Sequence, residues 1–189
     1  MKQQGSKTNI SFEFFPPKTE LGFQQLRNVA QTLALCHPRF YSVTFGAGGS
    51  TRVGTLNAVE ILAQQTGVTV APHLACIGAS KSEMVDTLRQ YRMKGIKRIV
   101  ALRGDIPSGM VQSGDFKYAC ELIPLIREEL GDSVHIEVAA YPEMHPQAVS
   151  FNDDVLNLKR KQDAGANGAI TQYFLNPDAY FHYLDDCQK

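Results

Sequence analysis

Glu13 is the first residue whose type and surroundings suggest chemistry. It lies in the stretch 11–17, where polar and aromatic side chains alternate as on a strand before a proline pair ends the strand. Phe12 and Phe14 share one face, and Glu13 and Phe15 share the other. We expect Glu13 to lie among these phenylalanines, where lost solvation raises the pKa of its carboxyl and suits it to general acid catalysis. The alternative is a strand-end glutamate bound to a neighbouring lysine or arginine.

A second carboxylate, Asp105, follows the very apolar segment 99–102. It is separated from Arg103 by Gly104, and a glycine between two charged residues allows a ligand to approach the backbone closely. The sequence therefore indicates a binding loop. An ion pair between Arg103 and Asp105 that closes the loop remains the alternative.

Other polar residues follow further apolar segments. His73 lies in a strand pattern, where a lone histidine is more often structural than a ligand. In the segment 141–146, two prolines fix the backbone and would hold Tyr141 and His145 in place. Gln172, in an apolar strand pattern, is suited to hydrogen-bonding an amide or the edge of a heterocycle.

Three consecutive cationic residues, Lys159, Arg160 and Lys161, fall in a helical pattern. Such a run is usually a solvated helix face. If the helix packs beside a binding site, one of the three would reach an anionic ligand. Both interpretations stay open at this point.

Strand patterns and helix patterns alternate along the whole chain. Strands are expected at 11–15, 39–45, 68–76, 97–102, 134–140 and 167–174, and helices at 20–35, 55–65, 80–95, 116–130, 153–164 and 177–187. Ser80 with Glu83 predicts a capping box, and Pro124 predicts a kink or a later start in its helix. Strict alternation indicates an α/β fold with a parallel sheet, either doubly wound or closed into a barrel. Polar residues after every strand favour the barrel, whose active site is built at one mouth.

The glycine-rich loop 46–50 does not carry a nucleotide fingerprint. A dinucleotide motif would need glycine at position 51, which is Thr51, and no Gly-Lys-Ser/Thr sequence follows for a P-loop.

The chain has 19 basic and 19 acidic residues among 189, which argues against nucleic-acid and membrane-surface partners. No apolar run approaches the roughly 20 residues of a membrane helix, and the N-terminus lacks a secretory pattern. The four cysteines lie far apart, so we expect no metal site, no disulfide framework and a cytoplasmic location.

Six short motifs, in this order and spacing, resemble the bacterial, flavin-containing methylenetetrahydrofolate reductase family. They lie at 12–17, 43–47, 71–74, 101–105, 139–143 and 163–166. The resemblance implies a (β/α)8 TIM barrel, of which this chain supplies about six strand–helix units. It also implies a flavin-dependent oxidoreductase that reduces 5,10-methylenetetrahydrofolate to 5-methyltetrahydrofolate with NAD(P)H, ping-pong through FAD, in one-carbon and methionine metabolism.

The resemblance also assigns roles to residues. Glu13 corresponds to the general acid that opens the folate imidazolidine ring, and the charge of Asp105 would stabilise a cationic intermediate. Glu13, Thr44, Asp105 and Gln172 correspond to substrate-binding positions. The cofactor-binding positions are Thr44, Phe45, Ala47, His73, Arg103, Gly104, Asp105, Tyr118, Ala119, Tyr141, His145, Ala148, Asp154, Asn157, Arg160 and Lys161. Phe45 stands where the family commonly has tyrosine.

The same resemblance implies one catalytic barrel domain over 1–189, with a flexible N-terminus at 1–8 and a C-terminally incomplete barrel. A homo-oligomer that binds folate and a nicotinamide dinucleotide is expected. Two alternatives remain. One is a barrel enzyme without flavin, such as an aldolase or a pterin-dependent transferase. The other is a regulatory or binding module without catalysis.

Overall fold

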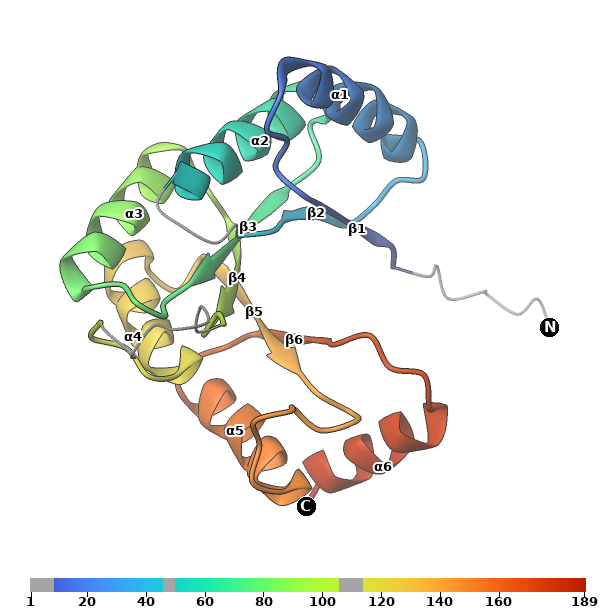
Figure 1. Ribbon diagram of the computed structural model, residues 1–189, viewed down its shortest axis with the longest axis vertical. Helices are drawn as coiled ribbons and strands as arrows, with labels where there is room; N and C mark the ends of the chain where they lie inside the picture. Colours follow the sequence, from blue (N-terminus) through green and yellow to red (C-terminus); the bar gives the residue numbers. More distant parts are fainter. Residues whose placement is uncertain (1–8, 46–49, 106–113) are drawn as a thin grey trace. The chain divides into compact units, whose positions relative to one another are not determined.

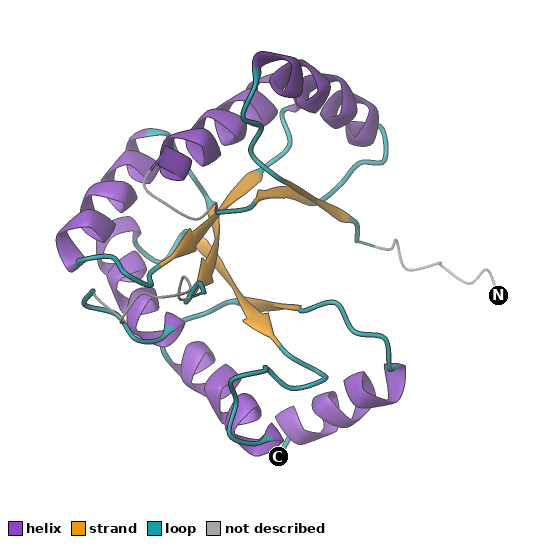
Figure 2. Ribbon diagram, in the orientation of Figure 1, coloured by secondary structure: helices purple, strands orange, loops and turns teal. Residues whose placement is uncertain are grey.

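The computed structural model describes residues 9–45, 50–105 and 114–189, with the backbone alone for 50–53 (Figure 1). Ala47 lies outside the described residues. So does the N-terminal segment 1–8, for which we expected flexibility. The chain divides into two compact units, Met1–His73 and Leu74–Lys189. Both units alternate strands with helices, as expected from the sequence (Figure 2).

The first unit contains β1 (Ser11–Phe14), α1 (Glu20–Ala34), β2 (Phe40–Val43), α2 (Ser50–Thr66) and the first residues of β3 (Val70–Ala75). Its strands pair in parallel, β1 with β2 and β2 with β3. Tyr41 is fully buried, and its hydroxyl donates a 2.8 Å hydrogen bond to the carbonyl of Ala30 in α1. The ring of Phe14 meets Tyr41 edge-on at 5.1 Å. This face of the strands is therefore the helix-packed one, and Glu13 and Ser42 belong to the opposite face.

The second unit contains α3 (Lys81–Met93), β4 (Arg98–Leu102), α4 (Ala119–Leu130), β5 (His135–Ala140), α5 (Phe151–Asp163), β6 (Gly168–Thr171) and α6 (Pro177–Cys187). β4 pairs with β5 and β5 with β6, again in parallel. Successive helices pack on one another from α3 to α6 (Figure 1). Leu122, Ile123 and Ile126 of α4 are fully buried, as is Ile136 of β5, and they form the core beneath the helices.

Most expected elements are present, and one local signal is confirmed in atomic detail. The Ser80 hydroxyl accepts from the Glu83 amide at 3.3 Å, and the Glu83 carboxylate accepts from the Ser80 amide at 2.8 Å. This is the capping box predicted for α3. The helix around Pro124 begins at Ala119, three residues later than expected, and runs through the proline.

Two further boundaries differ by three residues or more from those expected. α2 begins at Ser50 rather than at residue 55, so the helix includes the last residue of the glycine-rich stretch 46–50. β6 ends at Thr171 rather than at residue 174 because its ladder partner β5 ends at Ala140, which pairs with Thr171. Residues 172–174 have no strand opposite them in β5 and leave the sheet.

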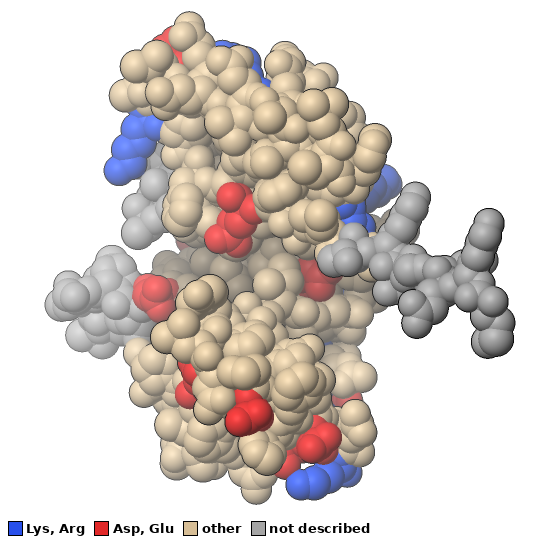
Figure 3. Space-filling model, turned by 90° about the vertical axis from the view of Figure 1, so that its right-hand side faces the viewer, with Lys and Arg blue, Asp and Glu red and all other residues tan. Residues whose placement is uncertain are grey.

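Figure 3 shows a face that is mostly uncharged, with acidic and basic side chains in several separate places. No helix among the described residues has the length and apolar character needed to cross a membrane. The strand order and parallel register within each unit are those of a (β/α) barrel, the fold class expected from the sequence.

Candidate active site

Glu13 stands near the C-terminal end of β1 and contacts two side chains of neighbouring strands. It lies across from Ser42 in the β1–β2 register, and the Ser42 hydroxyl donates to Glu13 Oε2 at 3.4 Å. His73 Nε2, from β3, lies 3.2 Å from the same oxygen. Three adjacent strands therefore converge on one carboxyl group.

The expected burial of Glu13 among phenylalanines is wrong, because half of its side-chain surface is exposed. Phe12 and Phe14 point to the other face of β1, where both pack against Tyr41. Phe15, beyond the end of β1, is 76% exposed and turns away. The alternative of a lysine or arginine partner also fails among the described residues, since the one ion-pair partner of Glu13 is His73.

His73 is the buried member of this contact, with only 10% of its side chain exposed. Burial lowers the pKa of its imidazole, and the charge of Glu13 opposes that shift only in part. The ring is therefore neutral at neutral pH. Its Nε2 lacks a hydrogen bond of acceptable geometry within the described chain, so the interpretation of His73 as a satisfied structural group does not hold.

Thr44 and Phe45 leave β2 beside Glu13. The Thr44 amide donates to the carbonyl of Phe14 at 2.9 Å, and its own carbonyl accepts from the Thr55 hydroxyl at 3.0 Å. Both side chains are half-buried, which leaves part of each surface available to a ligand. Ala47, the next expected contact, falls outside the described residues.

In the second unit, the loop Arg103–Gly104–Asp105 leaves β4. Arg103 donates to the Gln147 side chain at 2.6 Å and to the carbonyl of Gly104 at 3.2 Å, so its guanidinium turns toward the loop after β5. Among the described residues Arg103 makes no ion pair with Asp105, and the loop-closing alternative is wrong. Asp105 is exposed.

Gly104 is needed for packing as well as for access. Its φ is +87°, a left-handed conformation that favours glycine. An added Cβ would lie 2.8 Å from the Ile77 side chain and 3.0 Å from Ala75. The loop can therefore pass this close to the end of β3 only with glycine at this position.

The expected residues of the β5–α5 loop form one network. The rings of Tyr141 and His145 meet edge-on with centroids 4.6 Å apart, and the His145 amide donates to the buried carboxylate of Asp154. Burial raises the pKa of the Tyr141 hydroxyl; Asp154 and Asp105 add to that shift, and Arg103 opposes it. Arg103 and Asp105 thus lie near Tyr141, so the two loops share one electrostatic environment.

Of the three cationic residues on α5, Lys161 is the one that turns inward. Its ammonium donates to the carbonyl of Ala139, and burial lowers its pKa while Asp154 acts in the opposite direction. Lys159 is exposed and pairs with Asp163 at 3.0 Å, and exposed Arg160 donates to Asn157 at 2.6 Å. The interpretation of a solvated helix face is therefore confirmed for Lys159 and Arg160, and a contact of Lys161 with an anionic ligand stays a prediction.

The remaining expected residues lie at element ends. Tyr118 is the N-cap of α4 and is exposed, Ala119 begins that helix, and the amide of Ala148 donates to the carbonyl of His145 at 2.8 Å. Gln172 is exposed just past β6, not within a strand as expected. Its amide donates to Ala140 at 2.7 Å, and its side-chain oxygen accepts from the Tyr173 amide at 3.1 Å.

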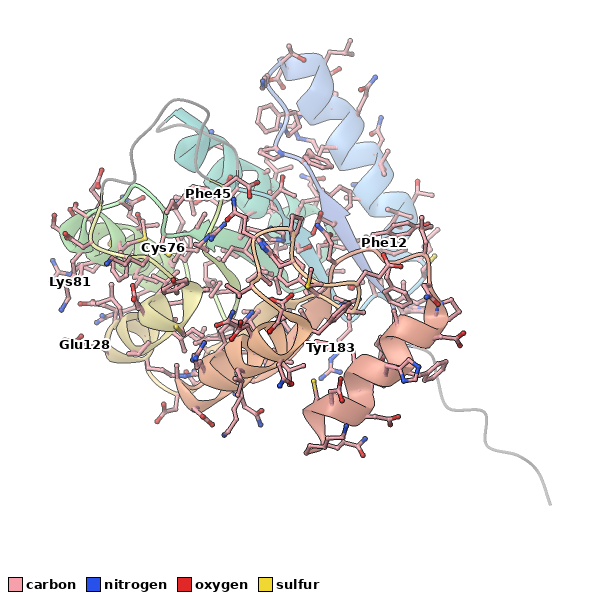
Figure 4. The ribbon with its side chains drawn as sticks, turned by 60° about the horizontal axis from the view of Figure 1, so that its bottom comes forward. Phe12, Phe45, Cys76, Lys81, Glu128 and Tyr183 are labelled. Atoms are coloured by element: carbon pink, nitrogen blue, oxygen red, sulfur yellow. The ribbon has the colours of Figure 1, made fainter. Side chains whose placement is uncertain are left out.

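Four residues that sequence reasoning did not single out support these positions. Gln147 holds Arg103, and Ser42 contacts Glu13. Glu143 accepts from the amides of Leu175 and Asn176 at 3.1 and 2.8 Å, which ties the β6–α6 loop to the β5–α5 loop. Tyr183 is the buried anchor of α6 and points toward α5 (Figure 4). Of these four residues, only Glu143 lies in a segment that the sequence pattern had marked, the segment 141–146 with its two prolines.

A cavity of about 490 Å³ lies between α5 and α6 of the second unit. It is lined by Phe151 and Val155 of α5, by His182 and Tyr183 of α6, and by Pro142 and Asn176 of the adjoining loops. None of the residues expected to carry chemistry lines it. Among the described residues, no cluster of histidine, cysteine and carboxylate side chains is suited to hold a metal ion.

The whole sequence, residues 1–189, matches one family, described as "Methylenetetrahydrofolate reductase". The chain belongs to this family. The curated 5,10-methylenetetrahydrofolate reductases of Escherichia coli K12 and Salmonella typhimurium LT2 are each 46% identical to it over 180 residues, or 95% of this chain and 59% of each relative. A probable methylenetetrahydrofolate reductase (NADH) of Oryza sativa subsp. japonica is 37% identical over 97% of this chain and 33% of that protein. The chain thus spans less than two thirds of the length of the relatives that it matches.

Two solved structures share the fold at low sequence identity. A 2,3-dimethylmalate lyase of the PEP mutase/isocitrate lyase superfamily has a TM-score of 0.64 at 12% identity, covering 95% of this chain and 62% of that chain. The aldolase QR15 has a TM-score of 0.59 at 10% identity, covering 89% of this chain and 70% of that one. These likenesses concern the fold alone, and they confirm the barrel class over a doubly wound sheet.

Proposed function

We propose that this chain carries the catalytic barrel segment of an enzyme that reduces 5,10-methylenetetrahydrofolate to 5-methyltetrahydrofolate with NAD(P)H. Family membership over the full sequence supports the reaction. The observation that carries the proposal is the Glu13 carboxyl, which is half exposed at a strand end and contacted by side chains from two further strands. A carboxyl that is held but still open to a ligand suits proton transfer.

Glu13 serves as the general acid in this proposal. Opening the five-membered ring of the folate requires a proton on the departing nitrogen, since an unprotonated amine anion is a poor leaving group. The exposed half of the Glu13 side chain can contact that nitrogen. Within the described chain, no lysine or arginine forms an ion pair with the carboxyl. A proton from solvent restores the acid afterwards.

Asp105 supplies fixed negative charge. Ring opening produces a cationic carbon–nitrogen double bond, and an ionised carboxylate beside it lowers the energy of the step that forms it. The exposed position of Asp105, free of an ion pair with Arg103, suits this role. Two carboxylates with opposite duties, one protonated and one charged, are a recognised pattern of acid–base sites.

The residues of the second unit fit an anionic dinucleotide such as FAD. Half-buried Lys161 uses only one of its three N–H groups on a described partner, the carbonyl of Ala139. Arg103 and Lys161 are suited to phosphate oxygens, and the ring edges of Tyr141 and His145 to a flat heterocycle. When bound, FAD would accept a hydride from NAD(P)H and then deliver it to the folate, which gives a ping-pong sequence. The other flavin-contacting positions named above belong to the same proposal.

Gln172 and Thr44 complete the proposed substrate contacts. The exposed amide of Gln172 can donate to and accept from a pterin or a nicotinamide. The family resemblance further supports one catalytic barrel domain, a homo-oligomer, and a cytoplasmic role in one-carbon and methionine metabolism.

The visible absorption spectrum of the purified chain tests this proposal. Bound flavin is yellow, anaerobic NADH should bleach it, and methylenetetrahydrofolate should restore the colour. A colourless chain that takes up no added FAD would favour a barrel enzyme without flavin. A yellow chain that NADH does not bleach would favour a binding module.

A further inference from the structure

His73 Nε2 is the one buried side-chain nitrogen or oxygen of the described residues that lacks a hydrogen-bond partner. Leaving such an atom unpaired is costly to folding, so its position calls for an explanation. Glu13 Oε2 lies 3.2 Å from it, within reach of a hydrogen bond, but the pair does not have the geometry of one. Catalytic hydrogen bonds are often poorly aligned before substrate binds.

The two oxygens of Glu13 have different surroundings. Oε2 lies 3.2 Å from His73 Nε2 and accepts from the Ser42 hydroxyl at 3.4 Å. Within the described chain, Oε1 has no contact of this kind. Among the described residues, the carboxyl is therefore held on one oxygen only.

We propose that His73 is a positioning residue for Glu13: its Nε2–H donates to Oε2, and Oε1 is left as the oxygen that gives its proton to the substrate. The inference rests on the proposed function and deepens it. One proton passes from Oε1 to the departing nitrogen, and one proton from water later returns to Oε1. His73 neither gains nor loses a proton, and Oε2 accepts from it in both states of the carboxyl. The strand register produces the arrangement, because Glu13 pairs with Ser42 and Ser42 with Ala71, two residues before His73 on the same face.

A kinetic split tests the catalytic part. His73→Leu removes the donor, and the ratio of the folate-reduction rate to the flavin-reduction rate should fall by about 10²-fold, the cost typical of a misplaced catalytic group. His73→Gln keeps an N–H near the position of Nε2 and should recover at least about tenfold of that ratio. Ser42→Ala, the matched control, removes the longer contact and should cost less. An unchanged ratio in His73→Leu, or no recovery in His73→Gln, would overturn the inference.

Nitrogen NMR of the ¹⁵N-labelled chain tests the contact without flavin or folate. His73 should show the Nε2–H tautomer, and Glu13→Gln should shift its Nε2 resonance while leaving the other four histidines in place. An Nδ1–H tautomer, or an Nε2 chemical shift that stays unchanged in Glu13→Gln, would refute the contact. If the NMR coupling is present and the chain reduces no folate, the proposed function fails and the contact stands, so the two failures are distinguishable.

Discussion

Among the described residues, two glutamate–histidine contacts lie on strands, and they differ in which partner is buried. In the first unit, His73 is buried and Glu13 is half exposed. In the second unit, Glu137 of β5 is the buried partner, with 10% of its side chain exposed, and His135 lies 3.0 Å away with 32% exposed. Arg98 of β4 also pairs with Glu137, whereas within the described chain no arginine or lysine reaches Glu13.

This difference separates a structural carboxylate from a chemically available one. A buried carboxylate must be paired to offset its desolvation, and Arg98 does this for Glu137. The space around Glu137 is also filled, since a Cβ on Gly168 would collide with its Oε2. Glu13 keeps solvent on one side and only an imidazole and a hydroxyl on the other, so a substrate can reach it.

The largest expected effect is on Glu13. Glu13→Gln keeps the shape of the side chain and removes the proton, so folate reduction should fall by about 10²–10⁴-fold. Flavin reduction by NAD(P)H needs no proton donor and should fall far less. Stopped-flow measurement of each half-reaction decides the matter, and equal losses in both would show that Glu13 is structural.

Glu137→Gln is the matched substitution at the other contact. It removes the negative charge that faces Arg98 and His135 while keeping the size of the side chain, and the free energy of unfolding should fall by about 3 kcal/mol. Urea unfolding of this variant beside Glu13→Gln provides the comparison. A large loss of stability in Glu13→Gln and none in Glu137→Gln would reverse the distinction drawn here.

Asp105→Asn separates charge from proton donation. Asparagine keeps the size and loses the charge, so hydride transfer to folate should slow by about 10²-fold while flavin affinity changes little. The rate of folate reduction at saturating substrate and the flavin dissociation constant measure the two effects. Hydride transfer at the unchanged rate would rule out the electrostatic role.

Gly168→Ala tests how tightly the space around Glu137 is filled. The new methyl group would meet the Glu137 carboxylate and force it away from Arg98 or β6 away from β5, at a cost of about 1–3 kcal/mol. Gly95→Ala is a contrasting control, because its Cβ would meet nothing within 4 Å and only its φ of +67° would resist. If both substitutions lower the melting temperature equally, crowding at Glu137 is not the cause.

The sequence predicted the order of elements well because that order depends on local patterns. Alternating or β-branched runs and the Ser80 capping box each act within a few residues. Boundaries that depend on a partner were missed. Residues 172–174 have strand-like side chains, yet β6 stops at Thr171 because β5 offers no further ladder groups.

For the candidate site, the sequence proposed the residues, and the structure shows their surroundings. The pattern around Glu13 singled it out and suggested burial, but strand alternation sends Phe12 and Phe14 to the opposite face. Ser42, Gln147 and Arg98 act through residues 29 to 44 positions away, and one sequence carries no sign of such pairings. Register and loop packing, which arise only in three dimensions, decide these contacts.

The smallest expected effect is a pH dependence of stability that the two contacts should not share. Burial lowers the pKa of His73 below its ordinary value of 6.5 in the folded chain. Between the lowered pKa of His73 in the folded chain and its ordinary value of 6.5, the unfolded chain binds more protons than the folded chain. Acidification below about pH 6.5 should therefore lower the free energy of unfolding. Glu13, Ser42 and the neutral strand β2 are the groups that face the imidazole in the first unit, and the Glu13 charge makes the effect smaller.

His73→Gln removes this titrating group, so its stability should fall less than that of the parent chain between pH 7 and pH 5. His135→Gln retains His73 and is the matched substitution at the other contact. Melting temperatures of the three chains across this range measure the slopes. Parallel curves of melting temperature against pH for the parent chain and His73→Gln would mean that the buried imidazole of the first unit does not resist protonation. The contrast between the two contacts would then rest on Arg98 alone.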